Sequence, residues 1–254
     1  MSEHLDIMSE PILYDIFNAN CVEDIEMYKE LCSNVDKVLE LGIGTGRVAI
    51  PLAQSGINVV GIDNSHRMLE TLKNKIDIGK IKEISFYHQE MQSIALESKF
   101  DMILCPFCAF NFLLSINDQE STLFSIRKLM KKESKIVFDL LTLNTFPGAF
   151  QDSSLKHFDS YLCPNEDAHI EIYTSSKFNQ CNQILSQERI FRKYDHDMLT
   201  AEFHSTMRNR LFFLGEFQLL LDKCGYKILN IYGNYRFSSF SQSSQELIVV
   251  ATLK

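Results

Sequence analysis

The chain has 254 residues, of which 45% are hydrophobic, enough to bury one sizeable core or one core plus a small additional unit. Its formal net charge of -8 argues against a nucleic-acid-binding surface, because neutralising phosphates requires a net basic face. We interpret the short basic clusters as solvated faces; they are Lys131-Lys132, Arg189 with Arg192-Lys193, and Arg208 with Arg210.

The cysteine pattern and the apolar segments bear on the compartment. Seven cysteines at irregular spacing favour reduced thiols in a cytosol over a disulfide framework. Cys105 and Cys108 form a C-x-x-C pair that ends a predicted strand, so we interpret both as small buried side chains rather than as a redox or metal site. The acidic first ten residues have no apolar signal segment, and the longest apolar run, 102–114, is too short to span a bilayer. We expect a cytoplasmic protein that binds neither a membrane nor a metal.

The first 148 residues alternate between helical and extended patterns. Residues 10–33 are predicted to be one helical segment with a broken apolar stripe. Short apolar strands are then predicted at 37–41, 58–62, 84–88, 101–105 and 135–141. Between them, helices are predicted at 46–54, from residue 64 or 65 to about 75, and from 117 or 118 to about 130. This alternation indicates an α/β fold with a parallel sheet covered on both faces.

The pattern changes after residue 148. Period-two stretches between 169 and 213 predict antiparallel strands inserted or appended beside the main sheet. A helix at 216–223, stopped by Gly225, precedes two further strands at 226–232 and 247–253. We expect three parts: an N-terminal helical cap of residues 1–36, a core of residues 37–148 and 214–254, and an antiparallel insertion of residues 149–213.

A glycine-rich turn follows the first predicted strand, in Glu40-Leu-Gly42-Ile-Gly44-Thr-Gly46-Arg47. Such a turn between a strand and a helix is typical of nucleotide binding. The dinucleotide pattern G-x-G-x-x-G has Arg47 where its third glycine should stand, and no Lys-Ser or Lys-Thr follows as a P-loop requires.

Acidic residues end the next two strands. Asp63 is placed to hold the ribose of any adenosine laid across the crevice. Glu90 is placed to accept a hydrogen bond from an adenine amino group, and Met91 to cover the ring. The glycine turn, Asp63 and Glu90 follow three successive predicted strands, and this arrangement favours an adenosine-containing ligand.

The stretch VLELGIGTGRVAIPLAQSGINVVGIDNSHRML resembles the first two motifs of the class I S-adenosylmethionine-dependent methyltransferases. The resemblance continues in FDMILCPFCAFNFLL, IVFDLL, IYGNYRF and ELIVVATLK. The opening YDIFNAN and EDIEMY are similar to a bacterial branch that includes amino-sugar, peptide and small-molecule N-methyltransferases. This resemblance implies a Rossmann-like, mostly parallel sheet of seven strands, with the inserted strands covering the substrate site.

The resemblance also implies S-adenosylmethionine as cofactor, S-adenosylhomocysteine as product, and a set of contacts. Gly42, Gly44 and Gly46 would let the backbone approach the methionine and ribose, and Glu40 would lie under the amino acid end. Tyr14 and Tyr28 would close over the cofactor; packing of an N-terminal helix is their alternative. Arg47 is either a solvated first-turn residue or a carboxylate contact. The full set of expected cofactor contacts is Tyr14, Tyr28, Glu40, Gly42, Gly44, Gly46, Arg47, Asp63, Asn64, Met68, Glu90, Met91 and Cys105.

The sulfonium already carries the activation for methyl transfer, so the protein mainly contributes positioning and desolvation. Relatives that use a general base often have a histidine next to the position of Phe112, and this chain has none there. An amine needs only to be bound in its neutral form and directed at the methyl group, whereas a hydroxyl or carbon nucleophile needs a positioned base. We therefore expect methylation of an amine of a small molecule or short peptide in secondary metabolism, with Tyr14, Asn111 and Asp139 as catalytic candidates.

Other functions compete with this one. An O- or C-methyltransferase would need a histidine from the inserted strands, and the candidates are His157, His169, His196 and His204. A cofactor-binding protein without catalysis is a second alternative. A nicotinamide oxidoreductase is a third, and Arg47 in place of a glycine counts against it.

Overall fold

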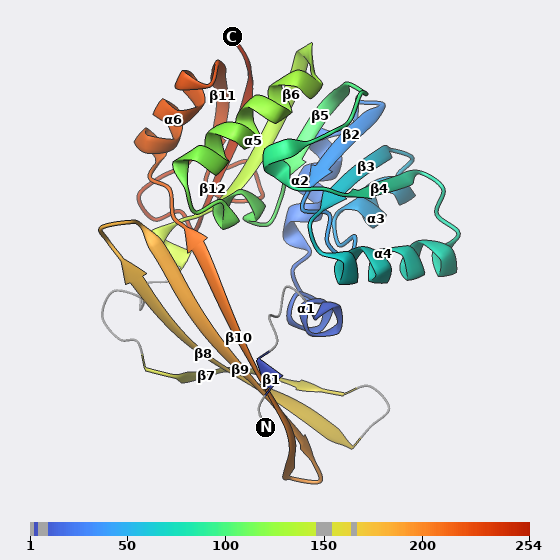
Figure 1. Cartoon of the computed structure of the whole chain (residues 1–254), viewed down its shortest axis with the longest axis vertical. Helices are drawn as coiled ribbons and strands as arrows, with labels where there is room; N and C mark the ends of the chain where they lie inside the picture. Colours follow the sequence, from blue (N-terminus) through green and yellow to red (C-terminus); the bar gives the residue numbers. More distant parts are fainter. Residues whose placement is uncertain (1–2, 5–9, 146–153, 164–166) are drawn as a thin grey trace.

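The computed structural model describes residues 3–4, 10–145, 154–163 and 167–254. Its larger sheet has seven strands, and Figure 1 shows this sheet in the upper part of the molecule. In spatial order the strands are β4 (Ile84–His88), β3 (Asn58–Asp63), β2 (Lys37–Leu41), β5 (Phe100–Cys105), β6 (Met130–Leu141), β12 (Glu246–Leu253) and β11 (Tyr226–Tyr232). The expected α/β fold with a seven-stranded sheet is confirmed.

The first five of these strands in spatial order run parallel, and the last two form the expected antiparallel hairpin at the β6 edge. The central strands β2 and β5 are buried over nearly their whole length, as strands covered on both faces must be. The strand order reverses at β2, whose neighbours are β3 and β5. Ligands of open α/β sheets bind outside the carboxyl ends of the strands at such a reversal.

The helices differ from the sequence-based expectation mainly at their ends. The single segment 10–33 is wrong, because the chain forms two helices, α1 (Pro11–Phe17) and α2 (Glu23–Leu31). The helix predicted from Gly46 begins three residues later, as α3 (Ala49–Gln54), since Gly44 and Gly46 adopt positive φ angles and prolong the turn. The remaining helices are α4 (His66–Gly79), α5 (Ile116–Leu129) and α6 (Leu214–Lys223).

A second sheet lies below the first in Figure 1. Its long antiparallel strands are β7 (Lys156–Leu162), β8 (Ala168–Asn179), β9 (Ile184–Asp195) and β10 (Met198–Arg210), and the short β1 (Glu3–His4) pairs in parallel with β10. The antiparallel pairing between 169 and 213 is confirmed, whereas β7 has too little alternation to be recognised.

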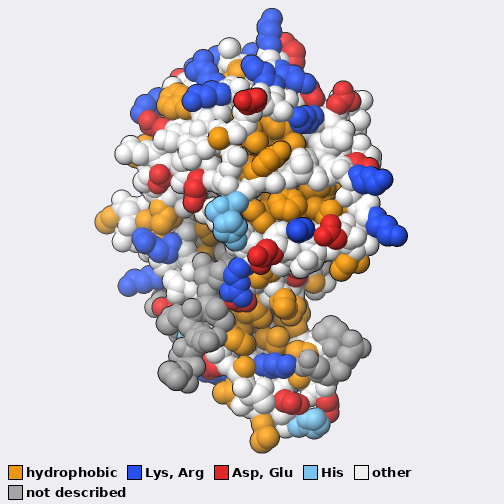
Figure 2. Space-filling view, turned by 45° about the vertical axis from the view of Figure 1, so that its right-hand side comes forward, with side chains coloured by type: hydrophobic (Ala, Val, Ile, Leu, Met, Phe, Trp, Pro, Cys, Tyr) orange, Lys and Arg blue, Asp and Glu red, His pale blue; other side chains and the backbone are white. Residues whose placement is uncertain are grey.

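Separate clusters of buried side chains hold the parts together. Two large clusters pack helices on the faces of the main sheet. A small cluster of Ile170, Ile172 and Phe191 packs the second sheet against Leu13 and Phe17 of α1. Figure 2 shows a broad upper body and a narrower lower part, with hydrophobic side chains at the surface of both. None of the described helices is long and apolar enough to cross a membrane.

Candidate functional site

The glycine turn lies at the carboxyl end of β2. The backbone amides of Gly42 and Ile43 both donate to the Ile62 carbonyl, at 2.8 and 3.0 Å, which joins the turn to β3. Gly44 has a φ of +54°, and the side where its Cβ would project is open apart from the Gly42 carbonyl 4.0 Å away. The backbone at Gly44 is therefore open to close approach by a ligand.

The other two glycines have different surroundings. A Cβ on Gly46 would lie 2.5 Å from Leu72 Cδ1, so this glycine is needed for packing against α4. A Cβ on Gly42 would lie 3.1 Å from the Ala109 Cβ and 3.5 Å from Met91 Cε. Of the three glycines in the motif, Gly44 has the most open space above it.

Asp63 fastens the end of β3 to this turn. Its Oδ2 accepts the Gly44 amide at 2.8 Å, and its Oδ1 accepts the Ser65 amide at 2.8 Å, just before α4. Each carboxylate oxygen has a second lone pair, so Asp63 still has acceptor capacity for hydroxyl groups. Met68, in the first turn of α4, is buried, and its backbone amide donates to the Ser65 hydroxyl at 3.4 Å.

Glu40 is a buried carboxyl group under the turn. Only 2% of its surface is exposed, and Oε2 has no hydrogen-bond partner among the described residues. Burial raises the pKa of Glu40 to about 8, an effect that the charge of Arg47 opposes. An additional cationic group bound above Glu40 would compensate the cost of its burial.

Glu90 and Asn64 form a polar pair beside the turn. The Asn64 amide nitrogen lies 3.3 and 3.4 Å from the two carboxylate oxygens of Glu90, and the Asn64 carbonyl contacts His88 Nε2 at 2.9 Å. Met91 follows Glu90 directly and is half-buried. The side chains expected around adenine therefore lie at neighbouring strand ends.

Arg47 corrects one expectation, because it is neither solvated nor in a helix. Its guanidinium forms a two-pronged ion pair with Asp24 of α2, at 2.6 and 2.8 Å, and stacks 4.2 Å from the centre of the Phe107 ring. Only 12% of the Arg47 side chain is exposed. Its carboxylate partner is thus a residue of the chain itself.

The two expected tyrosines have unequal positions. Tyr14 of α1 lines the cavity described below, and burial raises its pKa to about 12. Tyr28 has no exposed surface and donates to Oδ2 of Asp139 at 3.2 Å. It therefore packs the N-terminal helix α2 against the main sheet, which is the alternative to closing over a cofactor. Helix α1 also contacts the glycine turn, since Thr45 donates to Asp15 at 2.6 Å.

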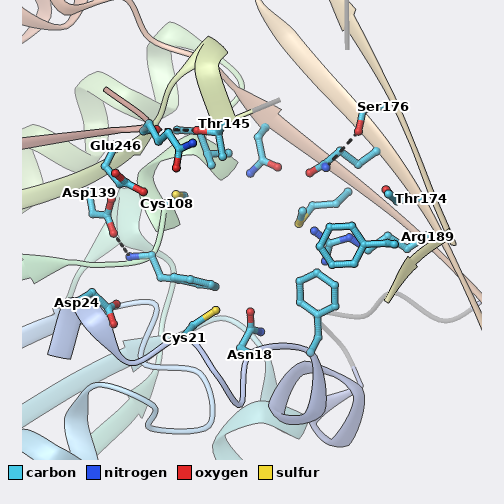
Figure 3. Close-up of a pocket in the computed structure, with 18 of the residues that line it drawn as sticks. Asn18, Cys21, Asp24, Cys108, Asp139, Thr145, Thr174, Ser176, Arg189 and Glu246 are labelled. Atoms are coloured by element: carbon cyan, nitrogen blue, oxygen red, sulfur yellow. Dashed lines mark hydrogen bonds between the residues drawn. The ribbon is translucent and has the colours of Figure 1, made fainter. Parts of the chain in front are cut away.

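A cavity of about 740 Å³ lies between the main sheet and the antiparallel sheet. Figure 3 shows its side chains converging from both sheets and from the N-terminal helices. The glycine turn does not line this cavity, so the cavity is a second compartment next to the turn. Its volume falls in the range of small-molecule sites.

Asp139, near the end of β6, is the most constrained acidic group in the cavity wall. Its Oδ2 accepts from Tyr235 at 2.9 Å, from the Phe107 amide at 3.1 Å and from Tyr28, while its Oδ1 is buried without a partner among the described residues. Burial raises the pKa of Asp139 to about 6, and the Tyr235 hydroxyl opposes that shift. Asp139 is therefore a buried carboxyl group with one oxygen held by three donors and the other left without a hydrogen bond to any described residue.

Asn111 lies differently from the expectation, whereas Cys105 is the small buried side chain that the sequence suggests. The Asn111 amide donates to the Arg210 carbonyl at 2.6 Å, and its carbonyl accepts from the Leu141 amide at 3.3 Å. Asn111 is fully buried and braces the junction of the two sheets, so it is not available to orient an acceptor. Cys105 is also fully buried, and burial raises its thiol pKa above the usual range. All seven cysteines are free thiols.

Some basic residues are not the solvated side chains that the sequence suggests. Arg189 is half-buried in the cavity wall, and burial lowers its pKa to about 10. The side chain of Arg210 is 12% exposed and is paired with Glu216. Sequence reasoning also missed Tyr235. The sequence carries no clear signal for Arg189, because this residue stands in a run with Arg192 and Lys193 that suggests a solvated cluster.

The four histidines of the second sheet do not line the cavity. His157 contacts Ser160, His169 stacks on Tyr194, His196 pairs with Asp195, and His204 pairs with Glu202. Each therefore has a partner elsewhere on its own sheet.

Comparisons with known proteins agree with this geometry. A family model described as a methyltransferase domain matches residues 38–133. The chain is 24% identical to the putative methyltransferase YqeM of Bacillus subtilis, over 85% of this chain and 83% of that protein. It is 25% identical to the cypemycin N-terminal methyltransferase of Streptomyces, over 84% and 81%. An S-adenosylmethionine-dependent methyltransferase structure from Clostridium acetobutylicum superposes with a TM-score of 0.78, at 19% identity and covering 95% of this chain and 96% of that one.

The site fits the cofactor of these enzymes on two observations. The backbone above Gly44 is open, and the orphaned Oε2 of Glu40 lies buried beneath the turn, where the ammonium of an amino acid would compensate its charge. Residues 38–133 match a methyltransferase domain, and together with the fold and this fit they indicate an enzyme that takes its methyl group from S-adenosylmethionine.

Proposed function

We propose that the enzyme methylates an amine of a small molecule or short peptide, in a pathway of secondary metabolism. The observation that carries this proposal is Asp139, a buried carboxyl group whose Oδ1 has no described partner, in a cavity wall that contains no histidine among its described residues. A carboxylate attracts an ammonium group and can accept a proton from it, whereas it is a weak base toward a hydroxyl.

We further propose how the residues divide between cofactor and acceptor. Glu40, Gly44, Asp63 and Glu90 with Met91 hold the cofactor at the strand ends. The bound sulfonium supplies the electrophilic methyl group. Asp139 then binds the acceptor amine and receives its proton at Oδ1, while Tyr235 and the Phe107 amide fix Oδ2. Tyr14, between the two compartments, helps to exclude water.

The relatives support an amine acceptor by analogy. One of the relatives aligned along most of its length is named as an N-terminal methyltransferase, which acts on an amine. The alternative of O- or C-methylation through a histidine is less supported, because the four candidate histidines have partners elsewhere on the second sheet.

The test is a set of matched primary amines and alcohols with the same carbon skeletons, incubated with S-adenosylmethionine and analysed by mass spectrometry. We expect methylated products from amines only, and a strong loss of turnover in Asp139→Asn. Asp101→Asn, at the opposite end of the neighbouring strand, is the matched control and should keep full turnover. Methylation of the alcohols but not of the amines would overturn the proposal.

A further inference from the structure

The face of the antiparallel sheet that meets the cavity changes character along its strands. Thr174 is paired with Arg189, and Ser176 with Gln187, so these side chains project from one face of the sheet. Further along, the same face presents Ile172 and Phe191, which are covered by α1. The apolar part is therefore packed, and the polar part borders the cavity.

We call this polar part the roof wall; it consists of Thr174, Ser176, Gln187, Arg189 and Asn209. Three of its oxygen atoms are buried without a hydrogen-bond partner among the described residues, namely Thr174 Oγ1, Gln187 Oε1 and Asn209 Oδ1. Packing alone would favour apolar residues at these positions, as it does along the rest of the face. The roof wall thus has hydrogen-bonding capacity that the folded chain does not use.

Arg189 is the central residue of the roof wall. Its guanidinium stacks 4.2 Å from the centre of the Phe17 ring, and no hydrogen bond or ion pair joins it to any other described residue. Burial without a compensating carboxylate explains why its pKa falls to about 10. Lys156 adds a second basic side chain to the same cavity. A guanidinium in this setting is suited to a two-pronged bond with a carboxylate or phosphate.

The opposite side of the cavity is acidic. Figure 3 shows Asp139, Glu246 and Asp24 on the main-sheet side, with Arg189, Thr174 and Ser176 across the cavity from them. Asp24 is neutralised by Arg47, which leaves Glu23, Asp139 and Glu246 as the acidic groups of the lining. The cavity therefore has an acidic side and a basic side, and its lining also includes apolar side chains such as Met207 and Phe158.

We propose that the methyl acceptor is a molecule with two charged ends, whose reactive amine lies by Asp139 and whose far end carries an anionic group bound by Arg189 and the roof wall. This inference rests on the proposed function, because it takes the amine to be the methylated group. Carboxylate and phosphate groups are both anions that can accept a two-pronged hydrogen bond from a guanidinium, so either could be the far end of the acceptor. A molecule of this kind satisfies both charged sides of the cavity at once.

The experiment uses ω-amino carboxylates of three to eight carbons, their ω-amino amides and the matching aminoalkyl phosphates as acceptors, with the enzyme saturated in S-adenosylmethionine. We expect kcat/KM for at least one chain length to be about tenfold or more higher for the anionic acceptor than for its amide. In Arg189→Gln we expect KM for anionic acceptors to rise by at least about tenfold, with KM for amides unchanged. A phosphate that outperforms the carboxylate of equal length identifies phosphate as the natural group.

Two variants serve as controls. Arg192→Gln removes a guanidinium from the other face of β9, where it pairs with Glu202, and should leave every KM unchanged. Arg189→Lys keeps the charge without the planar fork and should give an intermediate KM. Equal KM values for anionic acceptors and amides in the unmodified enzyme would overturn the inference, as would an equal rise for both in Arg189→Gln. If ω-hydroxy acids are methylated in place of ω-amino acids, the amine function fails while the anionic preference stands.

Discussion

The Tyr235 hydroxyl lies 2.9 Å from Oδ2 of Asp139, although 96 residues separate the two along the chain. Tyr235 follows β11 and Asp139 lies in β6, so folding of the C-terminal hairpin brings them together. The bond occupies one carboxylate oxygen and leaves the other without a partner. Asp139 is thereby held in one orientation at the cavity wall.

Asp139→Asn keeps the shape of this side chain and removes its charge. If Asp139 binds the amine and takes its proton, kcat/KM should fall by about 10²- to 10⁴-fold. Tyr235→Phe removes one hydrogen bond to the carboxylate and should cost less, about 10- to 100-fold. Steady-state kinetics with the best amine acceptor measures both. Equal, small effects of the two variants would contradict a direct role for Asp139.

Glu40 predicts how stability depends on pH in the cofactor-free protein. Burial raises the pKa of Glu40 from 4.5 to about 8. Between these values the unfolded chain has released the proton that the folded chain still holds, so stability falls as pH rises and the loss is complete above about pH 8. Urea unfolding from pH 5 to 9 should show this fall, and Glu40→Gln should reduce it. The exposed Glu133→Gln is the control; if it flattens the curve as much, the assignment to Glu40 is wrong.

Gly44 predicts a change in cofactor binding that is separate from stability. Alanine at this φ of +54° should cost about 1 kcal/mol of stability, as should Gly56→Ala at a φ of +88° in an exposed turn. Only Gly44→Ala adds a methyl group where the cofactor approaches, so we expect about tenfold or more weaker binding by calorimetry for it alone. Unchanged affinity in Gly44→Ala would place the cofactor elsewhere.

The buried pair of Arg47 and Asp24 predicts a loss of stability. Asp24→Asn leaves a buried guanidinium without its partner and should lower the free energy of unfolding by about 3 kcal/mol. Adding Arg47→Met to Asp24→Asn should recover part of this loss, because the uncompensated charge is removed. Denaturant unfolding of both single variants and the double variant gives the coupling energy. A strictly additive double variant would show that the pair does not act as a unit.

The arrangement of the main sheet could be predicted because its signals are local. The strand 37–41 and the glycine turn after it predict the first strand–turn–helix connection of the parallel sheet. The acidic residues Asp63 and Glu90 mark the ends of the next two strands. The division of 10–33 into α1 and α2 could not be predicted, because residues 18–22 contain no proline or glycine to mark the break.

The partners of the buried polar residues could not be predicted. Arg47 forms an ion pair with Asp24 of α2, and Asn111 donates a hydrogen bond to the Arg210 carbonyl 99 residues away. Neither contact corresponds to a periodic pattern in the sequence from which it could have been predicted. Arg189 stands in a run with Arg192 and Lys193, which suggests a solvated cluster. Only the pairing of β8 with β9 shows that Arg189 faces inward, opposite to Arg192.

The glycine turn and the roof wall belong to different hydrogen-bonded sheets. Substitutions at positions such as Gln187 or Asn209 alter side chains on the second sheet without changing the backbone of the turn after β2. Selection for a new acceptor can therefore act on one part of the protein while the methyl-donor site is preserved. This separation would allow relatives with the same core to diverge in the molecules they modify.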